Sequence, residues 1–195
     1  MSIFTKSFEL TTALTNFLIF IVSVFCVIKI KEKNWKTFYI LITIDSFLGT
    51  IVHGIVISDT IKTIIWSILA ISFVLTVNSL LLIFTNIKTR YPIYLSIIIS
   101  ILLLIQYFLN MRFLLTFTFY SLIIIIITFI YMIKSSLNNK KYFILGYVFQ
   151  IIGGVFLLSR VQFNYFNFNG IYHLFMLLTL IFFYIGIKKN NLVNI

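Results

Sequence analysis

The segment KIKEKNWK, residues 29–36, separates two apolar runs and carries four lysines. Each flanking run is about 20 residues long, the length that a helix rising about 1.5 Å per residue needs to cross a hydrocarbon core about 30 Å thick. Comparable polar breaks follow as TNIKTRYP, residues 85–92, and KSSLNNKK, residues 134–141. Short basic loops therefore divide this chain into apolar stretches, and we predict that these stretches are membrane helices.

The composition supports an all-α integral membrane protein. The 195 residues are 62% hydrophobic and 10% charged, with a mean hydropathy of +1.14, which leaves too little polar surface for a water-soluble globule. The single cysteine, Cys26, excludes an internal disulfide. We expect one seven-transmembrane helix bundle over residues 1–195, with spans near residues 8–28, 38–57, 61–84, 93–109, 113–133, 142–158 and 170–187.

The basic residues divide unevenly between the two sets of alternate loops. The smaller set holds Lys6, Lys62, Arg112 and Arg160. Because basic loops stay in the cytoplasm, we expect the N-terminus outside and the C-terminus in the cytoplasm, in a bacterial inner membrane. The net charge of +11 then reflects topology, so the expected partner is membrane lipid and not nucleic acid. The larger set, with the C-terminal tail, consists of Lys29, Lys31, Lys33, Lys36, Lys88, Arg90, Lys134, Lys140, Lys141, Lys188 and Lys189.

Polar residues inside the spans are the candidates for function, because such residues are costly in a membrane and usually face the bundle interior or a water-filled pocket. Asp45, Gly49 and His53 recur every four residues, which places them along one stripe of the second span. His173 lies one helical turn past Asn169 at the start of the seventh span. Both histidines are expected near the outer face, where neighbouring second and seventh spans bring them together.

Four other polar residues extend this candidate site. Glu9, Asp59 and Arg160 are expected at the depth of the histidines, where they would form an outer polar cluster. Asp45 lies deeper, about 12 Å from the cytoplasmic end of its span, and a carboxylate at that depth must be paired, protonated or functional. Asn78 is expected at a similar depth in the third span and within hydrogen-bonding reach of Asp45.

Two other residue types carry expectations about packing. Gly146, Gly153 and Gly154 in the sixth span are expected to let a neighbouring helix approach closely. Trp35 and Trp66 are expected to anchor the bundle at the membrane interfaces. Neither type indicates a chemical activity.

The spacing of the histidines resembles a known family. Gly49-x3-His53 in the second span and Asn169-x3-His173 in FNFNGIYHLF, residues 166–175, resemble the pattern of the CREST superfamily. That superfamily of seven-span membrane proteins includes the alkaline ceramidases, the progestin and adiponectin receptor relatives and the Per1-like lipid remodelling proteins. In its pattern, a Ser-x3-His and a His-x3-His hold a zinc ion that activates water against a lipid amide or ester, assisted by an Asp near the third helix.

The resemblance implies roles for particular residues. His53 and His173 match two zinc-ligand positions, and Asn169 stands where the family has the other histidine. Gly49 stands where the family has serine, and Asp59 is the acidic residue nearest to the start of the third span. Catalytic zinc usually has three protein ligands, and an amide is a poor third ligand for it. The alternative is that both histidines are hydrogen-bonded interior groups that hold helices together.

Three functions are compatible with these residues. The first is a metal-dependent hydrolase of lipid amides or esters, with its site at the outer leaflet and Asp59 or Asp45 as acid and base. The second is a non-enzymatic, receptor-like or lipid-binding protein in which the site has decayed. The third is a small transporter with a polar path through Asp45, Asn78 and Gln106, for which a single proline and seven glycines are unfavourable.

Overall fold

The residues that the structure describes fold into seven α-helices. The structure is a computed structural model that describes residues 7–84, 91–110, 113–163 and 166–191. Within these residues it contains no named strand, only an isolated bridge between Phe163 and Phe166, and the prediction of an all-helical chain is confirmed. The helices are α1 (Ser7–Lys29), α2 (Lys33–Gly54), α3 (Asp59–Phe84), α4 (Tyr91–Asn110), α5 (Phe113–Lys134), α6 (Lys140–Ser159) and α7 (Phe168–Asn191).

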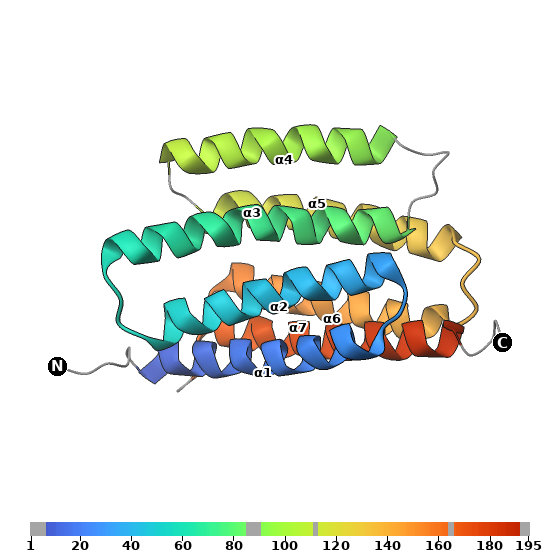
Figure 1. The fold of residues 1–195 in the computed structure, drawn as a ribbon, viewed down its shortest axis with the longest axis horizontal. Coiled ribbons are helices and arrows are strands. Elements are labelled where there is room, and N and C mark those ends of the chain that lie inside the picture. The colour runs from blue at the N-terminus through green and yellow to red at the C-terminus, as the bar shows by residue number, and fades with distance from the viewer. Residues whose placement is uncertain (1–6, 85–90, 111–112, 164–165, 192–195) are drawn as a thin grey trace.

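Six of the helices form a closed ring, and α4 lies outside it (Figure 1). The ring runs α1, α2, α3, α5, α6, α7 and returns to α1, while α4 packs against α3 and α5. Within the described residues α1 lies between α2 and α7 around the ring, so the second and seventh spans do not pack backbone to backbone as neighbours but meet through side chains across the ring interior. The helices on either side of α1 therefore face each other across the interior of the ring.

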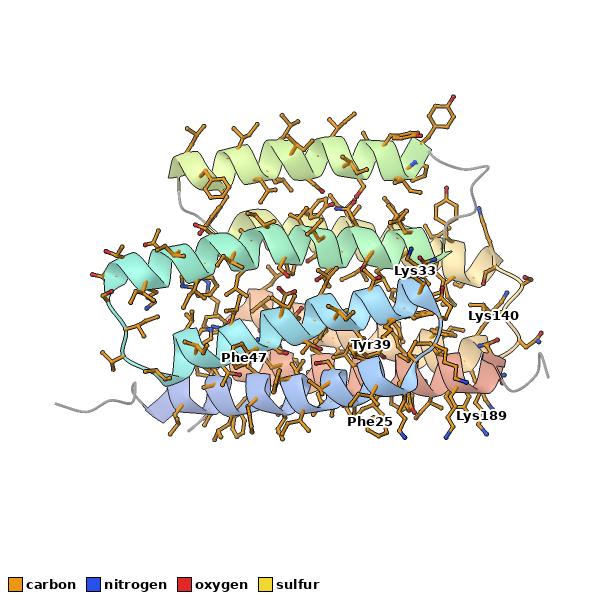
Figure 2. The ribbon with its side chains drawn as sticks, in the orientation of Figure 1. Phe25, Lys33, Tyr39, Phe47, Lys140 and Lys189 are labelled. Atoms are coloured by element: carbon orange, nitrogen blue, oxygen red, sulfur yellow. The ribbon has the colours of Figure 1, made fainter. Side chains whose placement is uncertain are left out.

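The described helices are those of an integral membrane protein. Six of them are long and apolar enough to cross a membrane by length and composition, and α5 contributes the described apolar stretch Tyr120–Lys134. Figure 2 places Lys33, Lys140 and Lys189 at the same end of the bundle. This end, defined by these three residues, is the lysine end.

Aromatic side chains close the interior of the ring near the lysine end. Trp35 of α2 stacks on Phe143 of α6 with ring centroids 5.6 Å apart, and its edge contacts include Phe183 of α7 at 5.7 Å. Trp35 was expected to anchor the bundle at the membrane interface. It is instead buried in this cluster. Tyr39 adds a hydrogen bond from its hydroxyl to the Leu180 carbonyl, 2.6 Å long, which ties α2 to α7. We call this cluster the aromatic floor; it consists of Trp35, Phe38, Phe84, Phe143, Tyr147 and Phe183.

Asn167 fixes the start of α7 and joins it to α1. Its side-chain Oδ1 accepts hydrogen bonds from the Gly170 N–H at 2.8 Å and from the Thr12 hydroxyl at 2.9 Å. The first bond satisfies a backbone donor that the first turn of a helix leaves free. The second is buried and crosses from one end of the sequence to the other, so a single amide caps α7 and positions it against α1.

We expect Asn167→Ala to lower the free energy of unfolding by about 2 kcal/mol, because the helix cap and the buried hydrogen bond to Thr12 are both lost. Thermal unfolding of the protein in detergent micelles measures the loss. The control is Asn139→Ala, because Asn139 is the N-cap residue of α6 but makes no capping hydrogen bond. Its side chain instead donates at an exposed position to the Lys189 carbonyl. Equal losses in the two variants would contradict this role of Asn167.

Candidate functional site

Among the described residues, the helices of the ring line an elongated, partly open cavity of about 570 Å³. Along α2 its lining extends from Phe38 in the aromatic floor to His53, which at about 1.5 Å per residue is about 22 Å. Most of the lining surface is apolar, and polar side chains lie at two levels that matter for function. One level holds both histidines and is called the histidine end. The other surrounds Asp45 and is called the middle.

The histidine end brings together three of the expected metal ligands. His53 of α2 and His173 and Asn169 of α7 all line the cavity. The two imidazoles are near enough to interact electrostatically. The His53 ring also lies edge-on to Trp66 of α3, with centroids 5.9 Å apart. His173 Nδ1 is 3.3 Å from the Thr15 hydroxyl of α1, so α1 orients one of the two rings.

The middle of the cavity is organised around Asp45, eight residues and about 12 Å along α2 from His53. Its Oδ2 accepts a hydrogen bond from the Thr76 hydroxyl of α3 at 3.0 Å. Its Oδ1 is buried and has no hydrogen-bond partner within the described residues. The Ser72 hydroxyl is close to this carboxylate, but it too makes no hydrogen bond there. One oxygen of a buried carboxylate is therefore left for something else to satisfy.

The other expected site residues lie elsewhere. Asp59 is exposed at the first residue of α3, and Arg160 is exposed at the C-cap of α6 with a left-handed φ of 53°. Neither is among the described residues that line the cavity. The side chain of Glu9 lies outside the described part of the structure. The expected outer cluster of these three residues with the histidines is therefore not formed by Asp59 or Arg160.

Asn78 belongs to a separate polar network. It donates from Nδ2 to the Ser100 hydroxyl at 2.9 Å and to the Tyr120 hydroxyl at 3.0 Å, and its Oδ1 accepts from the Ser96 hydroxyl at 2.6 Å. These partners belong to α4 and α5. The expected hydrogen bond from Asn78 to Asp45 is wrong, because Asn78 points away from the cavity and toward the outer helix α4.

Three cavity residues were missed by the sequence reasoning. Gln150 of α6 and Tyr172 of α7 line the cavity and are joined by a 3.3 Å hydrogen bond. Asn16 of α1 packs against Gly49 so closely that a Cβ at Gly49 would lie 3.0 Å from its side chain. Asn16 and Gln150 are polar residues within apolar helices, so the rule that singled out Asp45 also applies to them.

The candidate metal ligands at the histidine end meet only part of what a catalytic zinc ion requires. Two imidazoles and the amide of Asn169 share the histidine end, whereas a catalytic zinc ion usually has three strong protein ligands and one open position. Asp45 is the nearest acidic residue of the cavity lining and is about 12 Å away along α2. Within the described residues, no three His, Cys, Asp or Glu side chains are grouped as metal ligands would be.

Comparison with known proteins relates the chain to one family. No curated protein and no solved structure matches it. A family model described as a family of unknown function (DUF6962) matches residues 11–192. That range includes most of α1 and all of α2 to α7. Because the match covers most of the sequence, the chain belongs to this family of unknown function, DUF6962.

Proposed function

We propose that this protein binds an amphipathic lipid inside its helix ring, with a chain of the lipid in the cavity and its polar group toward the histidine end. The observation that carries the proposal is the elongated cavity of about 570 Å³, apolar over most of its length, closed by the aromatic floor and polar at the opposite end. This volume is in the usual range for small-molecule sites of about 300–1,000 Å³. Its length of about 22 Å exceeds half of a hydrocarbon core about 30 Å thick.

The proposed orientation puts the histidine end at the outer leaflet of a bacterial inner membrane. The support is the excess of lysine and arginine in alternate loops, since such loops remain cytoplasmic. Figure 2 places Lys33, Lys140 and Lys189 at one end of the bundle, and His53 lies at the end of α2 opposite to Lys33. In this orientation the N-terminus is outside, the C-terminus is cytoplasmic, and lipid enters from the outer leaflet.

We expect Ser46→Phe to reduce the lipid that co-purifies with the protein roughly tenfold, because a ring at this buried lining position fills the cavity. The control is Ile44→Phe, since Ile44 is exposed on the lipid-facing side of the same helix. Mass spectrometry of lipid extracted from each purified variant, per mole of protein, measures the effect. Wild-type protein without stoichiometric lipid, or equal lipid in the two variants, contradicts the proposal.

A second candidate is a CREST-like hydrolase of lipid amides or esters. The observation that favours it is that His53 and His173, from helices at opposite ends of the sequence, share one end of one cavity. These imidazoles, with Asn169, would hold the zinc ion, which would polarise the lipid carbonyl and lower the pKa of a bound water. Thr15 would fix the His173 ring. The acidic residue of the described lining, Asp45, lies about 12 Å away along α2, too far to accept the proton directly. The kinship with CREST proteins rests on the residue pattern alone.

Elemental analysis of purified protein separates the two candidates. The hydrolase requires zinc near one ion per chain in the wild type, lost in both His53→Ala and His173→Ala. It also requires release of fatty acid from a lipid amide or ester by the wild type and not by the variants. Lipid binding without zinc would leave the first proposal standing and remove the second.

A further inference from the structure

The middle of the cavity contains polar atoms that an apolar lipid chain would not need. Asp45 Oδ1 and Gln150 Oε1 are both buried without a hydrogen-bond partner in the described structure. Tyr172 relates the two residues, because its hydroxyl is hydrogen-bonded to Gln150 and it lies within electrostatic range of Asp45. Gln150 Nε2 donates to the Tyr172 hydroxyl, so Oε1 is the end that is left without a partner. The cavity thus contains a polar level about 12 Å below its histidine end.

These atoms need a hydrogen-bond donor. A buried carboxylate oxygen without a partner is destabilising, and native proteins nearly always pair such atoms. Thr76 satisfies one oxygen of Asp45, and the described cavity lining contains no lysine or arginine to satisfy the other. Two donors can reach this oxygen: the Ser72 hydroxyl, which is itself buried without a partner, and a donor group of whatever occupies the cavity.

We propose that Asp45 and Gln150 form a subsite for a hydrogen-bond-donating group of the bound lipid, a hydroxyl, an amine or an amide N–H. The inference rests on the proposed lipid binding and narrows the ligand to chains that carry such a donor. About 10 Å of cavity separates Asp45 from Phe38 in the aromatic floor, and about 12 Å separates it from the histidine end. The donor therefore lies within the length of the ligand, with an apolar segment reaching the floor.

Two brominated probes test the subsite in protein reconstituted into lipid nanodiscs. The probes are ω-bromoundecanol, which donates a hydrogen bond, and its methyl ether, which only accepts. Trp66 lines the cavity and Trp35 packs in its floor, and the chain has only these two tryptophans. Bromine quenching of tryptophan fluorescence therefore reports binding. We expect wild-type protein to bind the alcohol about tenfold more tightly than the ether.

Asp45→Asn is the decisive variant, because it keeps the size of the side chain and changes what faces the cavity. The Thr76 hydroxyl is within hydrogen-bonding distance of both this side chain and the Ser72 carbonyl, so it can donate to the oxygen of the new amide or accept from its NH₂. The carboxylate acceptor is lost in either orientation, so the preference for the alcohol over the ether should fall severalfold. Gln150→Leu should weaken alcohol binding severalfold and leave the ether unchanged. Thr63→Val is the control, since Thr63 lines the same cavity about 20 Å along α3 from Thr76.

The outcomes distinguish this inference from the function on which it rests. Equal affinity of the wild type for the two probes would mean that water or the Ser72 hydroxyl satisfies Asp45, and would overturn the subsite while lipid binding stands. If Asp45→Asn kept the wild-type preference for the alcohol over the ether, the subsite would likewise be overturned while lipid binding stands. Absence of quenching by either probe would overturn the subsite and the proposed lipid binding together.

Discussion

Gly146→Ala is expected to lower the free energy of unfolding by about 3 kcal/mol, the upper part of the usual range for overpacking a filled interior. A Cβ at Gly146 would lie 2.5 Å from Phe183 Cε1 and 2.6 Å from Cδ1. The Phe183 ring is almost fully buried between Trp35, Phe143 and Tyr147, so it has little room to move. The methyl group therefore separates α6 from α7 or disrupts the aromatic floor.

Gly154→Ala on the same helix is the matched control. A Cβ at Gly154 would meet nothing within 4 Å, so the same change costs no packing and removes the helix-weakening effect of glycine. Thermal unfolding in detergent micelles should show a lower midpoint for Gly146→Ala and an unchanged or higher midpoint for Gly154→Ala. Similar midpoints for the two variants would mean that the aromatic floor yields easily and does not hold the bundle together.

These two glycines illustrate how much packing the sequence predicted. Gly146, Gly153 and Gly154 were all expected at close helix contacts, and this is confirmed for Gly146 and Gly153, which approach Phe183 and Phe175. It is wrong for Gly154. Glycine in a membrane helix permits close approach, but the sequence does not say which face of the helix meets a neighbour. Adjacent glycines point about 100° apart, so only one of them faces α7.

Helix ends were predicted less well than helix centres. The second span was expected to begin near residue 38, where the apolar run starts, whereas α2 begins at Lys33. The reason is local: Glu32 accepts hydrogen bonds from the Asn34 and Trp35 amides and caps the helix within the basic loop. Hydropathy marks the part of a helix that fits the membrane core, and capping side chains decide where the helix itself begins.

The sequence predicted how deep the candidate site residues lie in the bundle, but it did not predict the direction in which their side chains point. Helical rise correctly gave His53 and His173 a common level, and both line one cavity. The same argument gave Asp45 and Asn78 a common depth, but Asn78 lies two residues beyond Thr76 on α3. At about 100° per residue, these two side chains point to nearly opposite sides of the helix. Thr76 therefore reaches Asp45, while Asn78 faces α4 and α5.

Asn78→Leu is expected to lower the free energy of unfolding by about 2 to 3 kcal/mol and to leave probe binding in the cavity unchanged. The variant removes hydrogen bonds to Ser96, Ser100 and Tyr120, each contributing about 0.6 to 1.7 kcal/mol between membrane helices. These bonds hold α4 against α3 and α5, and α4 lies outside the ring. Hydrogen exchange should therefore accelerate in α4 far more than in α1 or α7.

The same variant tests the transporter reading, which needs a continuous polar path through Asp45 and Asn78. In the structure these residues belong to separate hydrogen-bond networks on opposite sides of α3, one facing the cavity and one facing α4. Asn78→Leu should thus weaken the bundle without changing quenching by either brominated probe, whereas Asp45→Asn should change quenching. If Asn78→Leu altered probe affinity as strongly as Asp45→Asn, the two networks would be coupled through the cavity, to whose lining α4 contributes Tyr107.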